Sequence, residues 1–195
     1  MENVFLALVR AGLWGDVNEN QNENLLGRLD WGKVQKLAEE QSVVGLVAAG
    51  VEKLTAYTLP LTEKLMLLGK CQLIEQQNVA MNQFVAQLVA QMREVGISVV
   101  LLKGQGVAQC YERPLWRASG DVDFLLDEVN YEKAKSFLLP KATTVEKEFE
   151  YNKHQALTIG PYTVELHGNL RCGLSTKYWM RLERMCYMVV SFGHG

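Results

Sequence analysis

The stretch that decides the fold is residues 117–126, Arg-Ala-Ser-Gly-Asp-Val-Asp-Phe-Leu-Leu, in which two carboxylates interrupt an apolar run. Such a run predicts a buried β-strand. Alternate side chains of a strand point to the same face, so Asp121 and Asp123 share one face and Val122 and Phe124 share the other. Buried like charges repel and are costly to desolvate unless a cation lies between them. Because Mg²⁺ takes oxygen ligands and commonly binds together with phosphates, the pair predicts phosphoryl-group chemistry.

Segments on both sides of this pair predict a small mixed sheet. Residues 97–102 form a β-branched and leucine run of strand length, followed by the glycine turn 103–106 and a short helix through Tyr111. Downstream, Asp127 is a suitable N-cap for a helix over 129–138. Three further strands are expected at 143–149, 155–159 and 163–166, with Gly160-Pro161 as the turn between the last two.

The chain before this sheet has helical periodicity. Short helices are expected around Val4, Leu8 and Ala11 and over 31–41 and 43–54, and a long helix is expected from Pro60 to Gly96. One core-facing stripe on the long helix is predicted to contain Leu65, Leu68, Leu73, Val79, Phe84, Leu88 and Met92. The fold class is therefore α+β (mixed α/β), with a helical region over 1–95, an α/β core over 96–171, and a short C-terminal helix (176–190) and tail over 172–195.

Composition narrows the function classes. The chain has 195 residues, is 48% hydrophobic, and carries a net charge of −2, which disfavours a nucleic-acid substrate because no global positive field is present. Its four cysteines form no C-x-x-C pair and no zinc spacing, so they are read as free thiols in a reducing compartment. No apolar run reaches the length of about 18 residues that spans a bilayer, and no signal peptide is recognised, so a cytoplasmic location without membrane association is expected.

A third carboxylate belongs to the same prediction. Glu165 lies between Val164 and Leu166, so Glu165 and His167 share the opposite face of a strand. If this strand lies beside residues 121–126, three carboxylates converge and could bind two metal ions. The alternative for Glu165 alone is a solvated edge residue. His167 could orient a carboxylate or substrate, or could be structural, whereas His154 and His194 support no prediction.

The turn Lys103-Gly104-Gln105-Gly106 is a candidate phosphate site. It follows a strand and opens a helix, so its backbone N–H groups could face a phosphate, although no Walker sequence is present. Positive charge on either side comes from Lys103, Arg113 and Arg117, and Arg117 and Ser119 lie just before the aspartates. Each residue alone is typical of a protein surface, but together they would suit a polyphosphate.

These motifs, in this order, resemble the DNA polymerase β-like nucleotidyltransferase superfamily over residues 97–170. Within it the chain is similar to the uncharacterised bacterial branch with Leu-Lys-Gly, Arg-x-Ser-Gly-Asp-x-Asp and Glu-Leu-His. The resemblance implies a small sheet domain in which Asp121 and Asp123 bind both metals (Mg²⁺ or Mn²⁺), Glu165 is the third catalytic carboxylate, and residues 104–106 contact the triphosphate of an NTP. The Gly-Gln-Gly turn departs from the usual Gly-Gly or Gly-Ser.

The leading hypothesis is an enzyme: a Mg²⁺-dependent nucleotidyltransferase that moves a nucleoside monophosphate from an NTP such as ATP to a hydroxyl of a small molecule or protein. Lys103, Gly104, Gln105, Gly106, Arg117 and Ser119 would bind the nucleotide. The alternative is a non-catalytic nucleotide-binding regulator or antitoxin-like partner, which the early end of the chain after one helix favours. A third hypothesis is a structural ion site in a binding protein. A partner subunit or homo-oligomer would compensate for a shortened C-terminal region.

Overall fold

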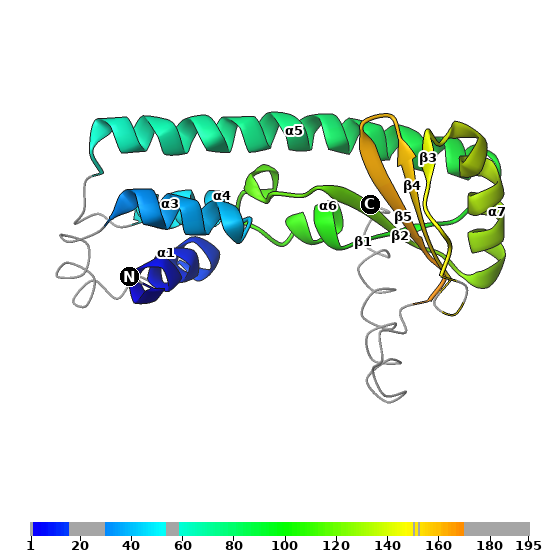
Figure 1. The fold of residues 1–195 in the computed structure, drawn as a ribbon, viewed down its shortest axis with the longest axis horizontal. Coiled ribbons are helices and arrows are strands. Elements are labelled where there is room, and N and C mark those ends of the chain that lie inside the picture. Colours follow the sequence, from blue (N-terminus) through cyan, green and yellow to red (C-terminus); the bar gives the residue numbers. More distant parts are fainter. Residues whose placement is uncertain (1, 16–29, 54–58, 150, 152, 170–195) are drawn as a thin grey trace, which may run out of the picture. The chain divides into compact units, whose positions relative to one another are not determined.

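The computed structural model describes residues 2–15, 30–53, 59–149, 151 and 153–169. They form two compact units, one from the described residues of 1–80 and 108–119 and the other from those of 81–107 and 120–195. The long helix α5 (Leu61–Glu94) contributes residues to both (Figure 1). The expected helical region followed by a mixed sheet is confirmed, and the fold is α+β.

The first unit is helical. It contains α1 (Glu2–Trp14), α3 (Trp31–Glu40), α4 (Val44–Lys53), the first part of α5 and the 3-10 turn η1 (Pro114–Trp116). Glycines let α1 and α4 touch along their backbones: a Cβ added at Gly12 would lie 2.0 Å from the Leu46 carbonyl oxygen, and one at Gly50 would lie 2.0 Å from that of Leu8. No residue with a Cβ fits at either position, so the close contact between α1 and α4 requires these two glycines.

The second unit contains the sheet. Its strands are β1 (Val100–Leu102), β2 (Asp121–Leu125), β3 (Thr144–Val145), β4 (His154–Ile159) and β5 (Tyr162–His167), in the order β1-β2-β5-β4-β3. Only the β2–β5 pair is parallel among the strand pairs of the described residues. The helices are α6 (Lys103–Ala108), α7 (Glu128–Leu138) and the 3-10 turn η2 (Leu139–Lys141), and α6 and α7 lie on opposite sides of the sheet (Figure 1). Asp127 caps α7 as expected, its carboxylate accepting the Asn130 N–H at 2.8 Å.

One face of the sheet is apolar and forms the core of this unit. Side chains from β2, β4 and β5 pack with the second part of α5 and with α7, and the largest of them are completely or almost completely buried. They include Phe124, Tyr131, Leu138, Leu157, Val164 and Leu166. Because strand side chains alternate, burial of this face presents Asp121, Asp123 and Glu165 on the other.

The predicted stripe on α5 is wrong over the first part of the helix. Leu65, Leu68, Leu73 and Val79 are exposed, and the buried positions are Leu67, Cys71, Asn78, Met81, Val85, Leu88 and Met92. At 3.6 residues per turn the buried set occupies an arc of about 100°, whereas the predicted set is spread over two faces. The helix α5 carries more apolar residues than the core can cover. Hydrophobicity alone therefore could not identify which of them are buried.

Two strand predictions need correction in length. The structure pairs only the end of the predicted 97–102 strand, as β1, and only two residues of the predicted 143–149 strand, as β3. Gly96 ends α5 with a positive φ of 72°, and the Ile97 side chain is buried in the core. The first residues of the predicted 97–102 strand therefore lie before β1. The predicted helix over 176–190 lies outside the described residues.

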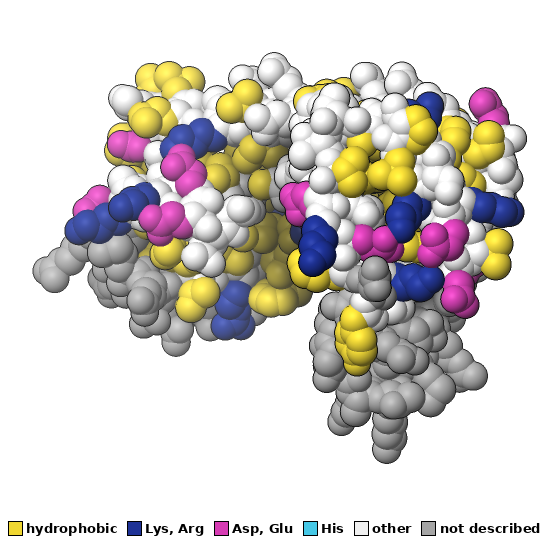
Figure 2. Space-filling view, turned by 45° about the vertical axis from the view of Figure 1, so that its right-hand side comes forward, with side chains coloured by type: hydrophobic (Ala, Val, Ile, Leu, Met, Phe, Trp, Pro, Cys, Tyr) yellow, Lys and Arg dark blue, Asp and Glu magenta, His cyan; other side chains and the backbone are white. Residues whose placement is uncertain are grey.

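On the face drawn in Figure 2, acidic and basic side chains of the described residues are interspersed with apolar ones. This face therefore offers no continuous basic surface to a nucleic-acid backbone. Among the residues described, no helix is long and apolar enough to cross a membrane.

Candidate functional site

The parallel pairing of β2 with β5 brings the carboxylates together. Asp123 lies directly opposite Glu165, and Asp121 lies opposite Thr163. Asp121, Asp123 and Glu165 each offer a carboxylate oxygen within 4.8 Å of the others. The two motifs are more than forty residues apart in sequence, and a single strand pair joins them.

Asp123 is the buried centre of this cluster. Its side chain is 0% exposed, and its Oδ1 accepts hydrogen bonds from Lys103 Nζ at 2.7 Å and from His167 Nε2 at 2.8 Å. Burial would raise the pKa of Asp123, but the hydrogen bonds from His167 and Lys103 outweigh burial and hold the pKa below its ordinary value. The second oxygen, Oδ2, is buried and has no hydrogen-bond partner within the described part of the chain. A buried carboxylate oxygen without a partner is costly, and a metal ion is one group that satisfies it.

Lys103, the first residue of α6, faces the carboxylates. Its hydrogen bond to Asp123, together with the negative charges of Glu165 and Asp121, raises the pKa of Lys103. The backbone of Lys103 has a φ of 40°, in the left-handed region that a residue with a Cβ rarely adopts. Strained backbone of this kind is concentrated at functional sites, where surrounding structure enforces it.

Residues 103–106, the predicted glycine turn, follow β1 directly and form the start of α6, whose backbone departs from helical geometry at Gly104. Gly106 has no room for a side chain: a Cβ at this position would lie 2.8 Å from the carbonyl oxygen of Leu101 in β1. The Gln105 side chain is buried and its Nε2 lies 3.1 Å from Met81 Sδ. The side chain of Gln105 therefore points into the protein and away from a ligand. Binding of phosphate by this turn stays a prediction.

Arg117 and Ser119 belong to the first unit. The Arg117 carbonyl accepts a hydrogen bond from Asn78 Nδ2 at 2.8 Å, and Asn78 also donates to the Leu115 carbonyl at 2.7 Å. The guanidinium of Arg117 lies 6.0 Å from the centre of the Tyr111 ring. The Ser119 hydroxyl is buried, with no hydrogen-bond partner in the described ranges. The assignment of both residues to nucleotide binding stays a prediction.

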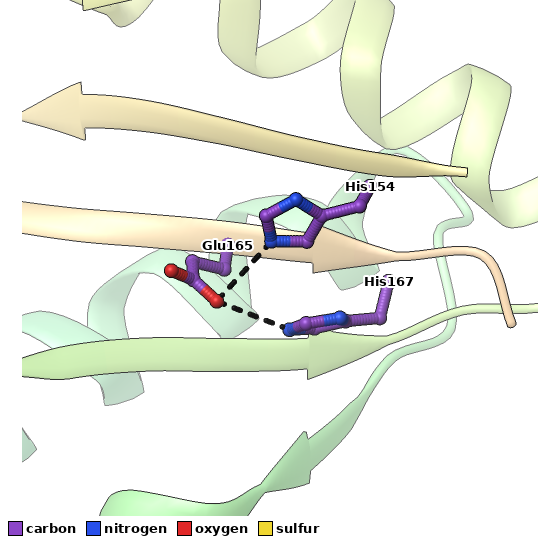
Figure 3. Close-up of side chains that lie close together, drawn as sticks. All are labelled: His154, Glu165 and His167. Atoms are coloured by element: carbon purple, nitrogen blue, oxygen red, sulfur yellow. Dashed lines mark hydrogen bonds and ion pairs between the residues drawn. The ribbon is translucent and has the colours of Figure 1, made fainter. Parts of the chain in front are cut away.

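Two histidines extend the cluster. His167 on β5 lies opposite His154 on β4, and Nε2 of each approaches the same Glu165 oxygen, Oε2, at 3.4 Å and 3.3 Å (Figure 3). His167 was a candidate from its place beside Glu165. His154 was missed, although a two-residue turn at 160–161 would pair residues 154 and 167 by counting outward from the turn.

The donor set defines the chemistry that this face can support. Three carboxylates, one of them with a free buried oxygen, match the oxygen ligands of Mg²⁺ and Mn²⁺. The apolar side of the sheet is packed, so the ligands are held on rigid strands. The residues present therefore fit a divalent metal.

The comparisons agree with this chemistry. Residues 27–185 match the sequence model of a family described as "Uncharacterised nucleotidyltransferase", and this span contains the whole carboxylate and histidine cluster. No curated protein matches the chain. No solved structure matches it either. Since the match covers most of the sequence, the chain belongs to this family of nucleotidyltransferases.

Proposed function

We propose that the protein transfers a nucleoside monophosphate from an NTP to a hydroxyl group on a small molecule or a protein, with Mg²⁺ or Mn²⁺ as the cofactor. The observation that carries this proposal is the convergence of Asp121, Asp123 and Glu165 in a member of a nucleotidyltransferase family. Within the described part of the chain, Asp123 Oδ2 is buried without a hydrogen-bond partner. In the transfer, the acceptor oxygen bonds to the α-phosphorus. The bond from that phosphorus to the bridging oxygen breaks, and pyrophosphate leaves.

Each residue has a distinct task in this scheme. Asp121, Asp123 and Glu165 hold the divalent cations, which when bound neutralise phosphate charge and make the acceptor hydroxyl easier to deprotonate. Lys103, whose ammonium lies 2.7 Å from Asp123, is near enough to this site to offset further negative charge on the triphosphate. The backbone of residues 104–106 is proposed to contact the phosphates, with Arg117 and Ser119 as further nucleotide ligands.

The position of the label in the nucleotide tests the reaction class. The purified chain is incubated with Mg²⁺, cell extract and ATP, GTP, CTP or UTP labelled at either the α- or the γ-phosphorus. Label from the α-position should appear on an acceptor, and label from the γ-position should appear only in pyrophosphate. Transfer of the γ-label would make the protein a kinase, and nucleotide binding without any transfer would favour the non-catalytic regulator.

A matched pair of variants ties the transfer to the cluster. Asp123→Asn removes one ligand charge and should abolish α-label transfer. Asp127→Asn makes the same chemical change four residues away at an exposed N-cap, where asparagine caps as well as aspartate, and should leave transfer unchanged. Equal transfer by the two variants would contradict the proposed site.

A further inference from the structure

The structure brings together a second group of possible metal ligands beside the carboxylate cluster: His154, Glu165 and His167. Their ligand atoms all lie within 4.8 Å of one another, and the side chains are partly buried, at 25%, 24% and 16% exposed. The two rings come from opposite residues of adjacent strands, and their Nε2 atoms turn toward one oxygen of Glu165 while its other oxygen points away (Figure 3). Two imidazoles and a carboxylate are typical ligands of a transition metal. Mg²⁺, in contrast, prefers oxygen ligands.

The distances are long for hydrogen bonds and are compatible with coordination of one ion. The Nε2 atoms of His154 and His167 lie 3.3 Å and 3.4 Å from Glu165 Oε2. Zn–N and Zn–O bonds of about 2.0–2.1 Å arranged tetrahedrally put neighbouring ligand atoms about 3.3–3.4 Å apart. Hydrogen bonds between such atoms are shorter, at about 2.9–3.0 Å.

The surrounding charge also favours a cation. The carboxylates of Asp121, Asp123 and Glu165 all lie near the Lys103 ammonium group, so among the described residues negative charge is in excess around it. His167 Nε2 also lies 2.8 Å from Asp123 Oδ1, to which it donates a proton when no metal is bound. A metal at this nitrogen takes the place of that proton, which leaves to the solvent.

We propose that His154, Glu165 and His167 form a second metal site, for a borderline divalent transition metal with Zn²⁺ as the best fit, next to the carboxylate site. Glu165 is shared between the two sites. Three protein ligands leave a fourth position open, as in zinc sites that bind a water or a substrate. The proposal concerns the same face of the sheet as the proposed function but does not rest on nucleotide transfer.

Co²⁺ is the probe that tests the site, because its visible absorption reports tetrahedral coordination and nitrogen ligands. The full chain is stripped of metal and titrated with Co²⁺ in the presence of excess Mg²⁺, and Zn²⁺ is then added as competitor. One equivalent of Co²⁺ should bind with a tetrahedral spectrum and be displaced by Zn²⁺. Absence of this spectrum in the wild-type protein would overturn the proposal.

Three variants locate the metal. Loss of an outer-shell partner already costs about 10–100-fold in metal affinity, so His154→Gln and His167→Gln should each weaken Co²⁺ binding by at least about tenfold. The matched control is His194→Gln, which changes the remaining histidine of the chain's three and should bind Co²⁺ like the wild type. Wild-type affinity in the His154 and His167 variants would overturn the site.

Two measurements separate this proposal from its alternatives. Asp121→Asn should retain Co²⁺ binding while losing affinity for Mg²⁺-ATP, whereas loss of both would mean that a single shared centre exists and would overturn a second site. X-ray absorption of the zinc-loaded wild type, which needs no variant to fold, should show two imidazole ligands and no sulfur. A sulfur ligand would assign the zinc to cysteines and reject the histidine site. Failure of nucleotide transfer alone leaves all these expectations unchanged.

Discussion

Gly106 offers a prediction whose size follows from the structure. A Cβ at this position would lie 2.8 Å from the Leu101 carbonyl oxygen, closer than a real Cβ contact, and the obstacle is backbone of β1 that cannot rotate away. Overpacking of this kind costs about 1–3 kcal/mol. Alanine recovers up to about 1 kcal/mol because it is the better helix former, so Gly106→Ala should lose about 1–2 kcal/mol of stability.

The loss is measurable by thermal and urea unfolding followed by circular dichroism. For a chain of this size, about 1 kcal/mol shifts Tm by about 2–4 °C, so the expected decrease is about 2–8 °C. The matched control is Gly69→Ala in the middle of α5, where nothing lies within 4 Å of the added Cβ. This variant should be at least as stable as the wild type.

The outcome also decides what the turn is for. If Gly106 is needed only for packing, folded Gly106→Ala protein should bind ATP normally at low temperature despite its lower Tm. A Tm equal to or above that of the wild type would refute the packing argument. A selective loss of ATP affinity at unchanged Tm would assign Gly106 to the phosphate site instead.

Two further predictions use the titration of buried or paired groups. Lys135 and Tyr131 donate hydrogen bonds to Glu148, and the bond from Lys135 is the main cause that lowers the pKa of Glu148. The stability gained from this carboxylate is present above its unfolded pKa of about 4.3 and lost as pH falls through the folded pKa. Urea unfolding should therefore show Glu148→Gln less stable than wild type at neutral pH and similar to it in strong acid; an equal difference at every pH would contradict this. Burial raises the pKa of the Cys71 thiol to about 11, whereas Cys110 is exposed. Iodoacetamide at mildly alkaline pH should therefore modify Cys110 in the folded protein and Cys71 only in denaturant, which peptide mass spectrometry would detect. Equal labelling of both in the folded protein would contradict the burial of Cys71.

The sequence predicted local features of the candidate site well. Alternation alone put Asp121 and Asp123 on one strand face and Glu165 with His167 on one face of another strand, and the structure has these faces. The strand of Glu165 was expected to neighbour that of the aspartates, and the β2–β5 pair confirms this. Its parallel direction and the register that places Asp123 opposite Glu165 were not predicted, because strand partners distant in sequence are chosen by the packed core and leave no local signal. The metal and nucleotide roles of these residues stay predictions.

Other features were hidden for specific physical reasons. The buried face of α5 could not be chosen because apolar residues occupy both sides of that helix, as exposed Leu65 and Leu73 show. Lys103, which donates a hydrogen bond to Asp123, has a positive φ, a backbone conformation that residue propensity disfavours. His154 had a usable signal in the hairpin register, but a lone histidine at a strand end is usually structural.

The measurement that tests the central claim most directly is calorimetric titration of ATP into wild-type protein and Asp123→Asn, each with and without Mg²⁺. Asparagine can still accept a hydrogen bond from Lys103 or His167, so the variant should fold, which circular dichroism checks. The account predicts Mg²⁺-dependent binding by the wild type and at least tenfold weaker binding by the variant, about 1.4 kcal/mol. Equal affinities for the two proteins, or wild-type binding that is independent of Mg²⁺, would contradict a metal-nucleotide site at these carboxylates.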